Sequence, residues 1–556
     1  MPPSYPENES DQKNMTVERL LLSGDDAVAL AALHAGVRLG TGYPGTPSTE
    51  ILETFDQLGG RAQWSPNEKV ALEVGIGSAF AGARTLVTMK HVGLNVAADA
   101  LFTAAYTDVE GGLVVVSADD PGMASSQNEQ DNRHYARAAA LPMLEPSDSQ
   151  QAYDFTWLAF EISERWKIPV ILRLTTRICH AKTVVRPRPA LQTLPEPHFK
   201  RDVPARVMIP AYAKPAHLRL RRKLAEIAAW NEAEGPFELH EGDPKLGIVA
   251  TGIGAMHARE AAPDATHLSF GLTYPLPIER LRAFADRVER LVVIEEGDPV
   301  LVDSLRAVGL PAEGKPEMYR FGELNVERVR RILANDTSPE AVPPKGKPPE
   351  LCPGCSHRGV FETLRDLDCI VSGDIGCYTL GVLPPFSAMD TCVCMGASIG
   401  VGLGLRHVLP EEQARRVVSV IGDSTFVHSG LTGLAEMVYN PPPTGHLVLI
   451  LDNGTTAMTG QQEHPGTGRL LDHSATNLLN FEETARAMGV QNVHVIDTTS
   501  LKDDSLRDLI TNLLACNETS LIVTRQPCVL AAPKIRLYEK ANAEQRAATC
   551  AADLVD

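Results

Sequence analysis

The stretches RVVSVIGDS (416–424) and HLVLILDNG (446–454) each run from a short apolar segment into an acidic turn. Such runs, rich in Val, Ile and Leu, are typical of parallel strands that are buried on both faces. The carboxyl ends of parallel strands meet at one edge of a sheet, and open α/β sheets bind ligands at that edge. We therefore predict an α/β fold in which these two turns lie side by side.

The two turns offer the groups that a diphosphate and its metal ion require. Gly422 lets the backbone approach a phosphate closely. Asp423 and Asn453, 30 residues apart, supply two oxygen ligands for Mg²⁺, and the carbonyl of Thr455 adds a third. A helix expected after Ser424 offers N-terminal amides to the phosphates. A lone Gly-Asp turn is usually only a turn, so it is the second, strand-borne turn that favours a diphosphate site.

This pair resembles the metal-binding signature of thiamine-diphosphate (TPP) enzymes, in which two such turns hold the cofactor. Ser424 stands where many of these enzymes have a second glycine.

Composition divides the chain into three bodies with mostly parallel, doubly wound sheets. Strand patterns alternate with helical patterns in each, and Pro-rich stretches separate them. The expected boundaries are a first body at 16–185, an extended linker at 186–218, a second body at 219–335, a linker at 336–351, a third body at 352–530 and a tail, helical or partly loose, at 531–556.

Charge and cysteine usage exclude several classes of protein. The net charge of −18 argues against nucleic-acid or anionic-membrane partners. No segment reaches the roughly 20 apolar residues of a membrane span, and the polar N-terminus lacks a signal core, so we expect a cytoplasmic chain. Nine of the ten cysteines follow residue 350, which favours metal ligands or small buried side chains over disulfides.

Further motifs, in order along residues from about 20 to 530, resemble the 2-oxoacid:ferredoxin oxidoreductase family. The nearest resemblance is to the large (alpha) subunits of its indolepyruvate branch. The motifs are GYPGTPSTE (42–50), NEKVALE (67–73), MKHVGLNVAADAL (89–101), SSQNEQDNR (125–133), PMLEPSD (142–148), LTTRICH (174–180), LCPGCSHRGVF (351–361), SGDIGCYTLG (372–381), GDSTFVHSGLTGL (422–434) and LDNGTTAMTGQQEHPGTG (451–468).

The resemblance implies a function for each body. The first would be the pyrimidine-binding TPP domain, the second a transketolase-C-like domain and the third the diphosphate- and Mg²⁺-binding domain. It also places Gly376, in SGDIGCYTLG, among the residues that contact the cofactor.

TPP chemistry requires one buried carboxylic acid near the aminopyrimidine. Glu68 occupies the family's position for this acid, and Glu73 is the alternative, although a solvated helix face suits it better. By the same resemblance Thr46 would hydrogen-bond the 2-oxo acid. Lys90 and His91, at the end of a buried strand, are the nearest cations for its carboxylate. Arg177 is a further candidate to bind this carboxylate. For each of these basic residues the competing interpretation is a structural ion pair.

Four cysteines resemble the family's cluster ligands: Cys352 and Cys355 in CPGC, Cys377 in GDIGC and Cys528 in RQPC. Four thiolates suit a [4Fe–4S] cluster and would equally suit zinc. Electron flow from TPP chemistry favours iron, because zinc has no redox chemistry. The other cysteines are interpreted as structural or incidental: Cys179, Cys369, Cys392, Cys394, Cys516 and Cys550.

These features predict oxidative decarboxylation of an aryl or branched, indolepyruvate-like 2-oxo acid to its acyl-CoA. Electrons would pass through the cluster to an external acceptor such as ferredoxin, since only Cys550 follows Cys528 and the family's C-terminal ferredoxin-like module is not found. The resemblance implies a smaller γ-type (beta) partner subunit and a heterotetramer. Two alternatives stay open: a non-oxidative TPP-dependent decarboxylase or ligase, and a non-catalytic scaffold subunit stabilised by zinc.

Overall fold

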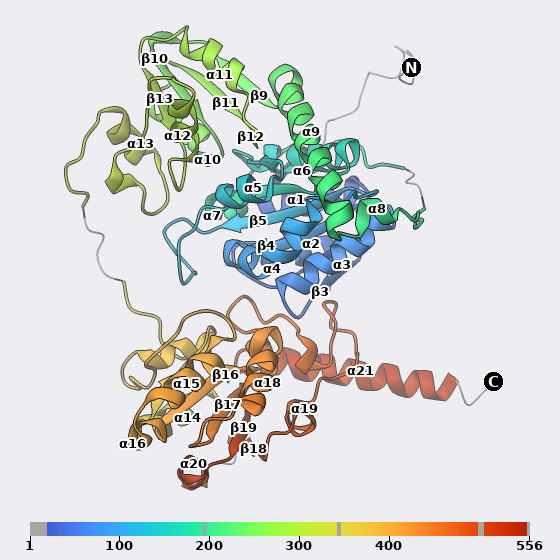
Figure 1. Cartoon of the computed structure of the whole chain (residues 1–556), viewed down its shortest axis with the longest axis vertical. Helices are drawn as coiled ribbons and strands as arrows, with labels where there is room; N and C mark the ends of the chain where they lie inside the picture. The colour runs from blue at the N-terminus through green and yellow to red at the C-terminus, as the bar shows by residue number, and fades with distance from the viewer. Residues whose placement is uncertain (1–18, 193–195, 342–345, 499–504, 553–556) are drawn as a thin grey trace.

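A computed structural model describes residues 19–192, 196–341, 346–498 and 505–552, the side chains of 545–552 excepted. Three sheets form the cores of three bodies, and Figure 1 shows the third body packed beneath the first, near α3 and β3. No helix among the described residues is long and apolar enough to cross a membrane.

The first body is a seven-stranded sheet in the order β12-β6-β7-β5-β4-β2-β3, parallel except for β12. Its strands are β2 (Leu39–Gly42), β3 (Ala62–Trp64), β4 (Thr85–Lys90), β5 (Leu113–Asp119), β6 (Met143–Leu144), β7 (Val170–Thr175) and β12 (Leu272–Tyr274), with a separate antiparallel pair β1 (Leu20–Leu22) and β8 (Thr183–Val185). Its helices are α1 (Gly24–His34), α2 (Thr49–Gln57), α3 (Glu68–Phe80), α4 (His91–Ala104), α5 (Arg133–Ala139), α6 (Ser149–Trp166), α7 (Thr176–His180), α8 (Val203–Arg206) and α9 (Pro210–Glu234).

The second body has a five-stranded sheet in the order β14-β13-β10-β11-β9, in which only β9 is antiparallel. The strands are β9 (Phe237–His240), β10 (Asp243–Ala250), β11 (Ala265–Phe270), β13 (Leu291–Ile294) and β14 (Ala312–Glu313). The helices are α10 (Ile253–Ala261), α11 (Ile278–Ala285), α12 (Val300–Ala307), η1 (Glu317–Tyr319) and α13 (Val326–Leu333).

The third body is an all-parallel sheet in the order β15-β16-β17-β19-β18. Its strands are β15 (Ile370–Ser372), β16 (Val417–Gly422), β17 (His446–Asp452), β18 (Asn492–Asp497) and β19 (Thr519–Arg525). Its helical segments are α14 (Arg358–Asp366), η2 (Cys377–Val382), α15 (Ala397–Val408), α16 (Glu411–Ala414), α17 (Asp423–Thr425), η3 (Phe426–Gly430), α18 (Leu431–Tyr439), η4 (Pro465–Thr467), α19 (Phe481–Met488), α20 (Ser505–Ala515) and α21 (Ala532–Ala552).

The strand β17 shows why this sheet is doubly wound. Leu447, Leu449 and Leu451 point to one face, where they pack with residues of α14 and α20. Val448 and Ile450 point to the other face, towards α15, α18 and α19. Because successive strand residues alternate between faces, a continuous apolar run requires helices on both sides. The predicted α/β class with doubly wound parallel sheets is confirmed.

The predicted extended linker at 186–218 is wrong over its last part. Residues from Pro210 onward form the 25-residue helix α9, because Pro210 occupies the first helical turn, where no N–H is needed. Leu220, Leu224 and Ile227 follow at helical spacing and pack into the core of the first body. The boundary predicted at 219 therefore cuts through a helix. The second body also lends β12 to the first sheet.

A buried ion network joins the first two bodies. The guanidinium of Arg173 donates to Asp119 at 2.7 Å and to Glu145 at 2.9 Å. Arg133 pairs with Asp131 of the same body and with Glu295 of the second body. All of these side chains are almost fully buried. The two guanidinium groups offset part of the charge of the four carboxylates, in a medium where an unpaired charge is costly.

Replacing Arg173 should therefore destabilise the protein strongly. Arg173→Met leaves buried carboxylates uncompensated, and we expect the free energy of unfolding to fall by about 3–5 kcal/mol, measured by chemical denaturation. Arg177→Met is the matched control, because Arg177 forms only an exposed pair with Glu323 and should cost less than about 1 kcal/mol. Equal effects of the two substitutions would contradict the role of the network.

Candidate functional site

The site lies where the first and third bodies meet. The hydroxyls of Tyr43 and Ser424 are 2.8 Å apart, and the amide of Asn67 donates to the carbonyl of His428 at 2.9 Å. A further contact joins Glu68 to the same histidine. These contacts bring the loops after β2 and β3 against the segment after β16.

A cavity between the two bodies gathers most of the predicted site residues. From the first body it is lined by Tyr43, Pro44, Gly45, Thr46, Lys90, Val92, Ser125 and Gln127. From the third body it is lined by Ile375, Gly376, Cys377, Tyr378, Met395, Gly422, Asp423, Ser424, Thr425, Asn453, Thr455, Thr456, Ala457, Met458 and Thr459. Residues more than 400 positions apart in the sequence thus line the same cavity.

Glu68 begins α3 and is buried at the edge of this region. Its Oε2 lies 2.8 Å from Nε2 of His428, and the ring of Tyr43 meets that imidazole edge-on, with 4.8 Å between centroids. A Cβ at Gly93 would lie 2.6 Å from Oε1 of Glu68, so α4 approaches the carboxyl group closely because residue 93 is a glycine. The carboxyl group is held by both bodies.

Asp423 and Asn453 lie side by side, as the two parallel strands predict. Oδ2 of Asp423 accepts the backbone N–H groups of Asn453 at 3.1 Å and Gly454 at 2.8 Å, and Oδ1 accepts that of Ser424. Burial raises the pKa of Asp423, but the adjacent His464 and the N–H donors outweigh it and hold that pKa below its usual range. An ionised, preoriented carboxylate of this kind suits a hard cation.

The amide of Asn453 is oriented by a second imidazole. Its Nδ2 donates to Nε2 of His357 at 3.3 Å. Burial lowers the pKa of His357 to about 4, so the ring is neutral near pH 7 and accepts this bond. Oδ1 of Asn453 accepts the N–H of Thr455, which closes the turn.

Ser424 occupies the position where a glycine is common in TPP enzymes. Its hydroxyl contacts that of Tyr43 in the first body, and it accepts the hydroxyl proton of Thr456 at 2.8 Å. The serine therefore links the two bodies at the cavity wall.

Two glycines allow the backbone to pack against Tyr378. A Cβ at Gly376 would lie 2.4 Å from that ring, and one at Gly422 would lie 2.6 Å from it. Asp374 holds the Gly376 loop, since its carboxylate accepts backbone N–H groups of Ile375, Gly396 and Ser398. The loop is thereby tied to the start of α15.

Thr46 and Lys90 line the cavity from the first body. Nζ of Lys90 donates to the carbonyl of Ser125 at 2.8 Å. Burial lowers the pKa of Lys90, although Asp120 and Glu68 act in the opposite direction. Lys90 is thus a partly buried amine at the wall of the cavity.

The structure does not bring three other candidates into the cavity. His91 begins α4 with its ring turned inwards, where Nε2 lies 3.1 Å from the carbonyl of Asn128, so packing rather than substrate explains it. Arg177 forms an exposed ion pair with Glu323. Glu73 is exposed and pairs with Lys69 on the outer face of α3.

The four cysteines predicted to bind a cluster lie near one another. One of them, Cys528, adjoins the turn that contains Asn453. Burial, with the neighbouring thiols of Cys528, Cys355 and Cys352, raises the pKa of Cys377 to about 11. The N–H of Cys528 donates to the carbonyl of Asn453 at 2.9 Å. Cys377 also lines the cavity, so the thiol group adjoins the site itself.

The other described cysteines are not among the thiols that raise the pKa of Cys377. Cys179 packs in the core of the first body and Cys369 against that of the third. The thiol of Cys516 donates to the carbonyl oxygen of Asn512 in α20. Cys392 and Cys394 are exposed, and the side chain of Cys550 lies outside the described residues.

The residues of the site that were not predicted include His428, Asp374, His357 and His464. Each lies inside a motif that the sequence displays, in FVHSG, SGDIG, CSHRG and QQEHPG. Their partners are distant in sequence or belong to the backbone, so only their position within the motifs could have indicated them.

The sequence matches two protein families and several curated proteins. Residues 30–226 match the family "Pyruvate flavodoxin/ferredoxin oxidoreductase, thiamine diphosphate-binding", and residues 374–524 match "Thiamine pyrophosphate enzyme, C-terminal TPP binding domain". The indolepyruvate oxidoreductase subunit IorA of Archaeoglobus fulgidus is 38% identical over 94% of this chain and 88% of its own length. The chain belongs to the 2-oxoacid:ferredoxin oxidoreductase family.

A second relative and one solved structure give the following similarities. IorA of Thermococcus kodakarensis is 39% identical over 92% of this chain and 86% of its own length. The 2-oxoglutarate:ferredoxin oxidoreductase of Magnetococcus marinus superposes with a TM-score of 0.48 at 16% identity, covering 57% of this chain and 65% of that one. As a member of this family, the chain is a TPP-dependent 2-oxoacid oxidoreductase subunit with TPP-binding domains.

Removing the carboxylate at the turn should abolish cofactor retention. Asp423→Ala removes the carboxylate that would bind Mg²⁺ beside the diphosphate. TPP should then be lost on gel filtration even in the presence of Mg²⁺, as measured by the TPP content of the denatured protein. Asp472→Ala, which removes an exposed acid that accepts hydrogen bonds from Ser474 of its own turn, is the control. Unchanged TPP content in Asp423→Ala would contradict the assignment.

Proposed function

We propose that this chain catalyses the oxidative decarboxylation of an aryl or branched 2-oxo acid, of the indolepyruvate kind, to an acyl-CoA. The observation that carries the proposal is the single cavity lined by the Asp423–Asn453 turn, Lys90 and Cys377. A cofactor site, a cation for the substrate and a thiol of the four-cysteine group therefore share one wall.

Bound TPP supplies the nucleophilic carbon that cleaves the bond next to a 2-oxo group. Glu68 would hold the proton at N1′ of the aminopyrimidine, which would let the 4′-amino group across the ring act as a base. His428 and Gly93 fix the position of its carboxyl group. The burial of Glu68 between two bodies keeps water from competing for that proton.

Asp423, Asn453 and the carbonyl of Thr455 would hold Mg²⁺. The residues fit this ion because all three donors are oxygens and Asp423 is ionised and already oriented by backbone N–H groups. Gly422 and Gly376 line the cavity, and their backbones would lie close to the diphosphate. Neither carries a Cβ, which lets both pack against Tyr378 at the same site.

The substrate pocket combines a cation with an apolar wall. Lys90 neutralises the substrate carboxylate, and Thr46 hydrogen-bonds its 2-oxo group. Val92, Met395 and Met458 line the same cavity, and flexible methionines accommodate large apolar groups. This lining supports an aryl or branched side chain over a small or acidic one.

The four thiols would hold a [4Fe–4S] cluster through Cys352, Cys355, Cys377 and Cys528. The proposed reaction favours a cluster, in which each thiolate binds a separate iron, over the zinc scaffold, because a cluster accepts electrons and zinc has no redox chemistry.

A non-oxidative decarboxylase or ligase remains the second candidate function. The same TPP-binding residues would serve it, and the thiols would then be structural. The position of Cys377 at the cavity wall favours the oxidative reaction, because electrons leaving the substrate need an acceptor close by.

An anaerobic screen of 2-oxo acids tests the reaction. With TPP, Mg²⁺ and CoA, the complex of this chain with its partner should reduce a viologen dye with indolepyruvate or a branched 2-oxo acid. Omitting CoA should lower the rate at least tenfold. Release of CO₂ without dye reduction would support the non-oxidative alternative and contradict the proposal.

The Glu68→Gln variant tests the proton-holding role. It should bind TPP but lose at least about 10²-fold in rate, because a neutral amide cannot hold and release the proton at N1′. The matched control is Glu73→Gln on the exposed face of the same helix, which should keep near-native activity. Near-native activity in Glu68→Gln would show that another acid performs this role.

We also propose a smaller γ-type subunit as partner, in a heterotetramer with two copies of each chain, and ferredoxin or a similar protein as the electron acceptor. Twofold assemblies dominate among oligomers. The isolated chain should bind TPP yet turn over slowly or not at all. Full CoA-dependent viologen reduction by the chain purified alone would contradict this arrangement.

A further inference from the structure

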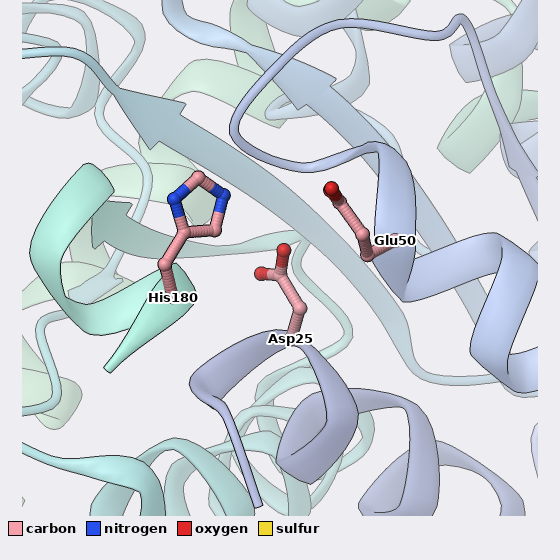
Figure 2. A group of neighbouring side chains, drawn as sticks. All are labelled: Asp25, Glu50 and His180. Carbon is pink, nitrogen blue, oxygen red and sulfur yellow. The ribbon is translucent and has the colours of Figure 1, made fainter. Parts of the chain in front are cut away.

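Three side chains of ligand type converge outside the cavity, each from a different helix. Asp25 lies in the first turn of α1, Glu50 in the first turn of α2 and His180 at the end of α7. One ligand atom of each lies within 4.8 Å of the other two, and Figure 2 shows the three groups facing one another. Among the described residues no other group of three meets this criterion.

Asp25 has an unusual environment for a carboxyl group. It is 1% exposed, and neither of its oxygens has a hydrogen-bond partner of good geometry. The buried Cys179 thiol contacts it, but a thiol is a weak donor. Burial raises the pKa of Asp25 well above its ordinary value. A buried carboxylate without a partner is costly, so the group needs either a proton or a cation.

The three helices are held together independently of these side chains. A Cβ at Gly24 would lie 2.2 Å from the carbonyl oxygen of Ile178, so the glycine lets α1 press against α7. Ser23 and Asp26 form a capping box at the start of α1, and Oδ1 of Asp26 accepts the hydroxyl proton of Thr54 in α2 at 3.2 Å. The convergence is therefore built into the packing.

We propose that Asp25, Glu50 and His180 bind a divalent transition-metal ion, with zinc as the best match to the donors. One imidazole nitrogen and two carboxylate oxygens suit zinc, whereas Mg²⁺ and Ca²⁺ prefer oxygen alone. Ligand atoms 2.0–2.2 Å from a tetrahedral ion lie about 3.4 Å apart. Glu50 and His180 are exposed, so rotation of their side chains closes the remaining gap, and water completes the coordination.

Such an ion would fix the loop that lines the cavity. Thr49, which precedes Glu50, accepts the N–H of Gly45 at 3.0 Å, and Thr46 follows in the same loop. By tying the start of α2 to α1 and α7, the ion would hold Thr46 in place. This consequence rests on the proposed function, whereas the binding of the ion does not.

Zinc stoichiometry tests the site. The full chain, freed of metal, would be equilibrated with zinc alone and gel-filtered, and its zinc content measured by mass spectrometry. Asp25→Asn and His180→Ala should each hold one equivalent per chain less than the wild type. His134→Ala, which removes an exposed histidine paired with Asp298, should not. Zinc on the thiols contributes equally to all samples and cancels in the difference.

The exposed position of His180 keeps the test decisive if Asp25→Asn fails to fold, as circular dichroism would show. Zinc should also raise the Tm of the wild type and not that of His180→Ala. Equal zinc content in wild type and His180→Ala would overturn the site and show that Asp25 is simply protonated. The zinc measurement uses no substrate, so an inactive complex in the viologen screen would leave this site standing.

Discussion

The contact between Glu68 and His428 is the constraint on which the rest of the site depends. A carboxyl group from the first body is buried against an imidazole from the third, 2.8 Å apart and 360 residues away in sequence. Burying an ionisable group requires a partner with good geometry, so the two bodies must meet in one arrangement. The Tyr43–Ser424 and Asn67–His428 contacts stabilise the same arrangement, and the cavity lies between them.

Much of the fold could be predicted because strands and turns are local patterns. Apolar runs at 416–424 and 446–454 predicted β16 and β17, whose bounds in the structure fall within those segments. The helix α9 was missed because prolines dominate its beginning, whereas burial of Leu220, Leu224 and Ile227 decides its conformation. The strand β12 could not be predicted from local pattern, since three residues of the second body pair with β6, more than 100 residues earlier in the first body.

The site residues likewise include some that could be predicted from the sequence and some that could not. Asp423 and Asn453 were predictable because two neighbouring parallel strands must deliver their turns to one edge. His428 was not, because its significance comes from Glu68, a residue of another domain. His91 shows the converse: it follows Lys90 directly, yet the start of α4 turns its ring into the core while Lys90 lines the cavity. Sequence proximity to a site does not determine side-chain direction.

The central claim is that one chain forms a complete site from its own two domains. Co-expression of Glu68→Gln and Asp423→Ala chains, with hydrogen–deuterium exchange at C2 of the bound TPP as the readout, tests it directly. Within one chain, neither variant has both groups, so the mixed assembly should exchange no faster than Glu68→Gln alone. Recovery of a substantial fraction of wild-type exchange in the mixture would mean that Glu68 of one copy serves the cofactor of another, and would contradict the account.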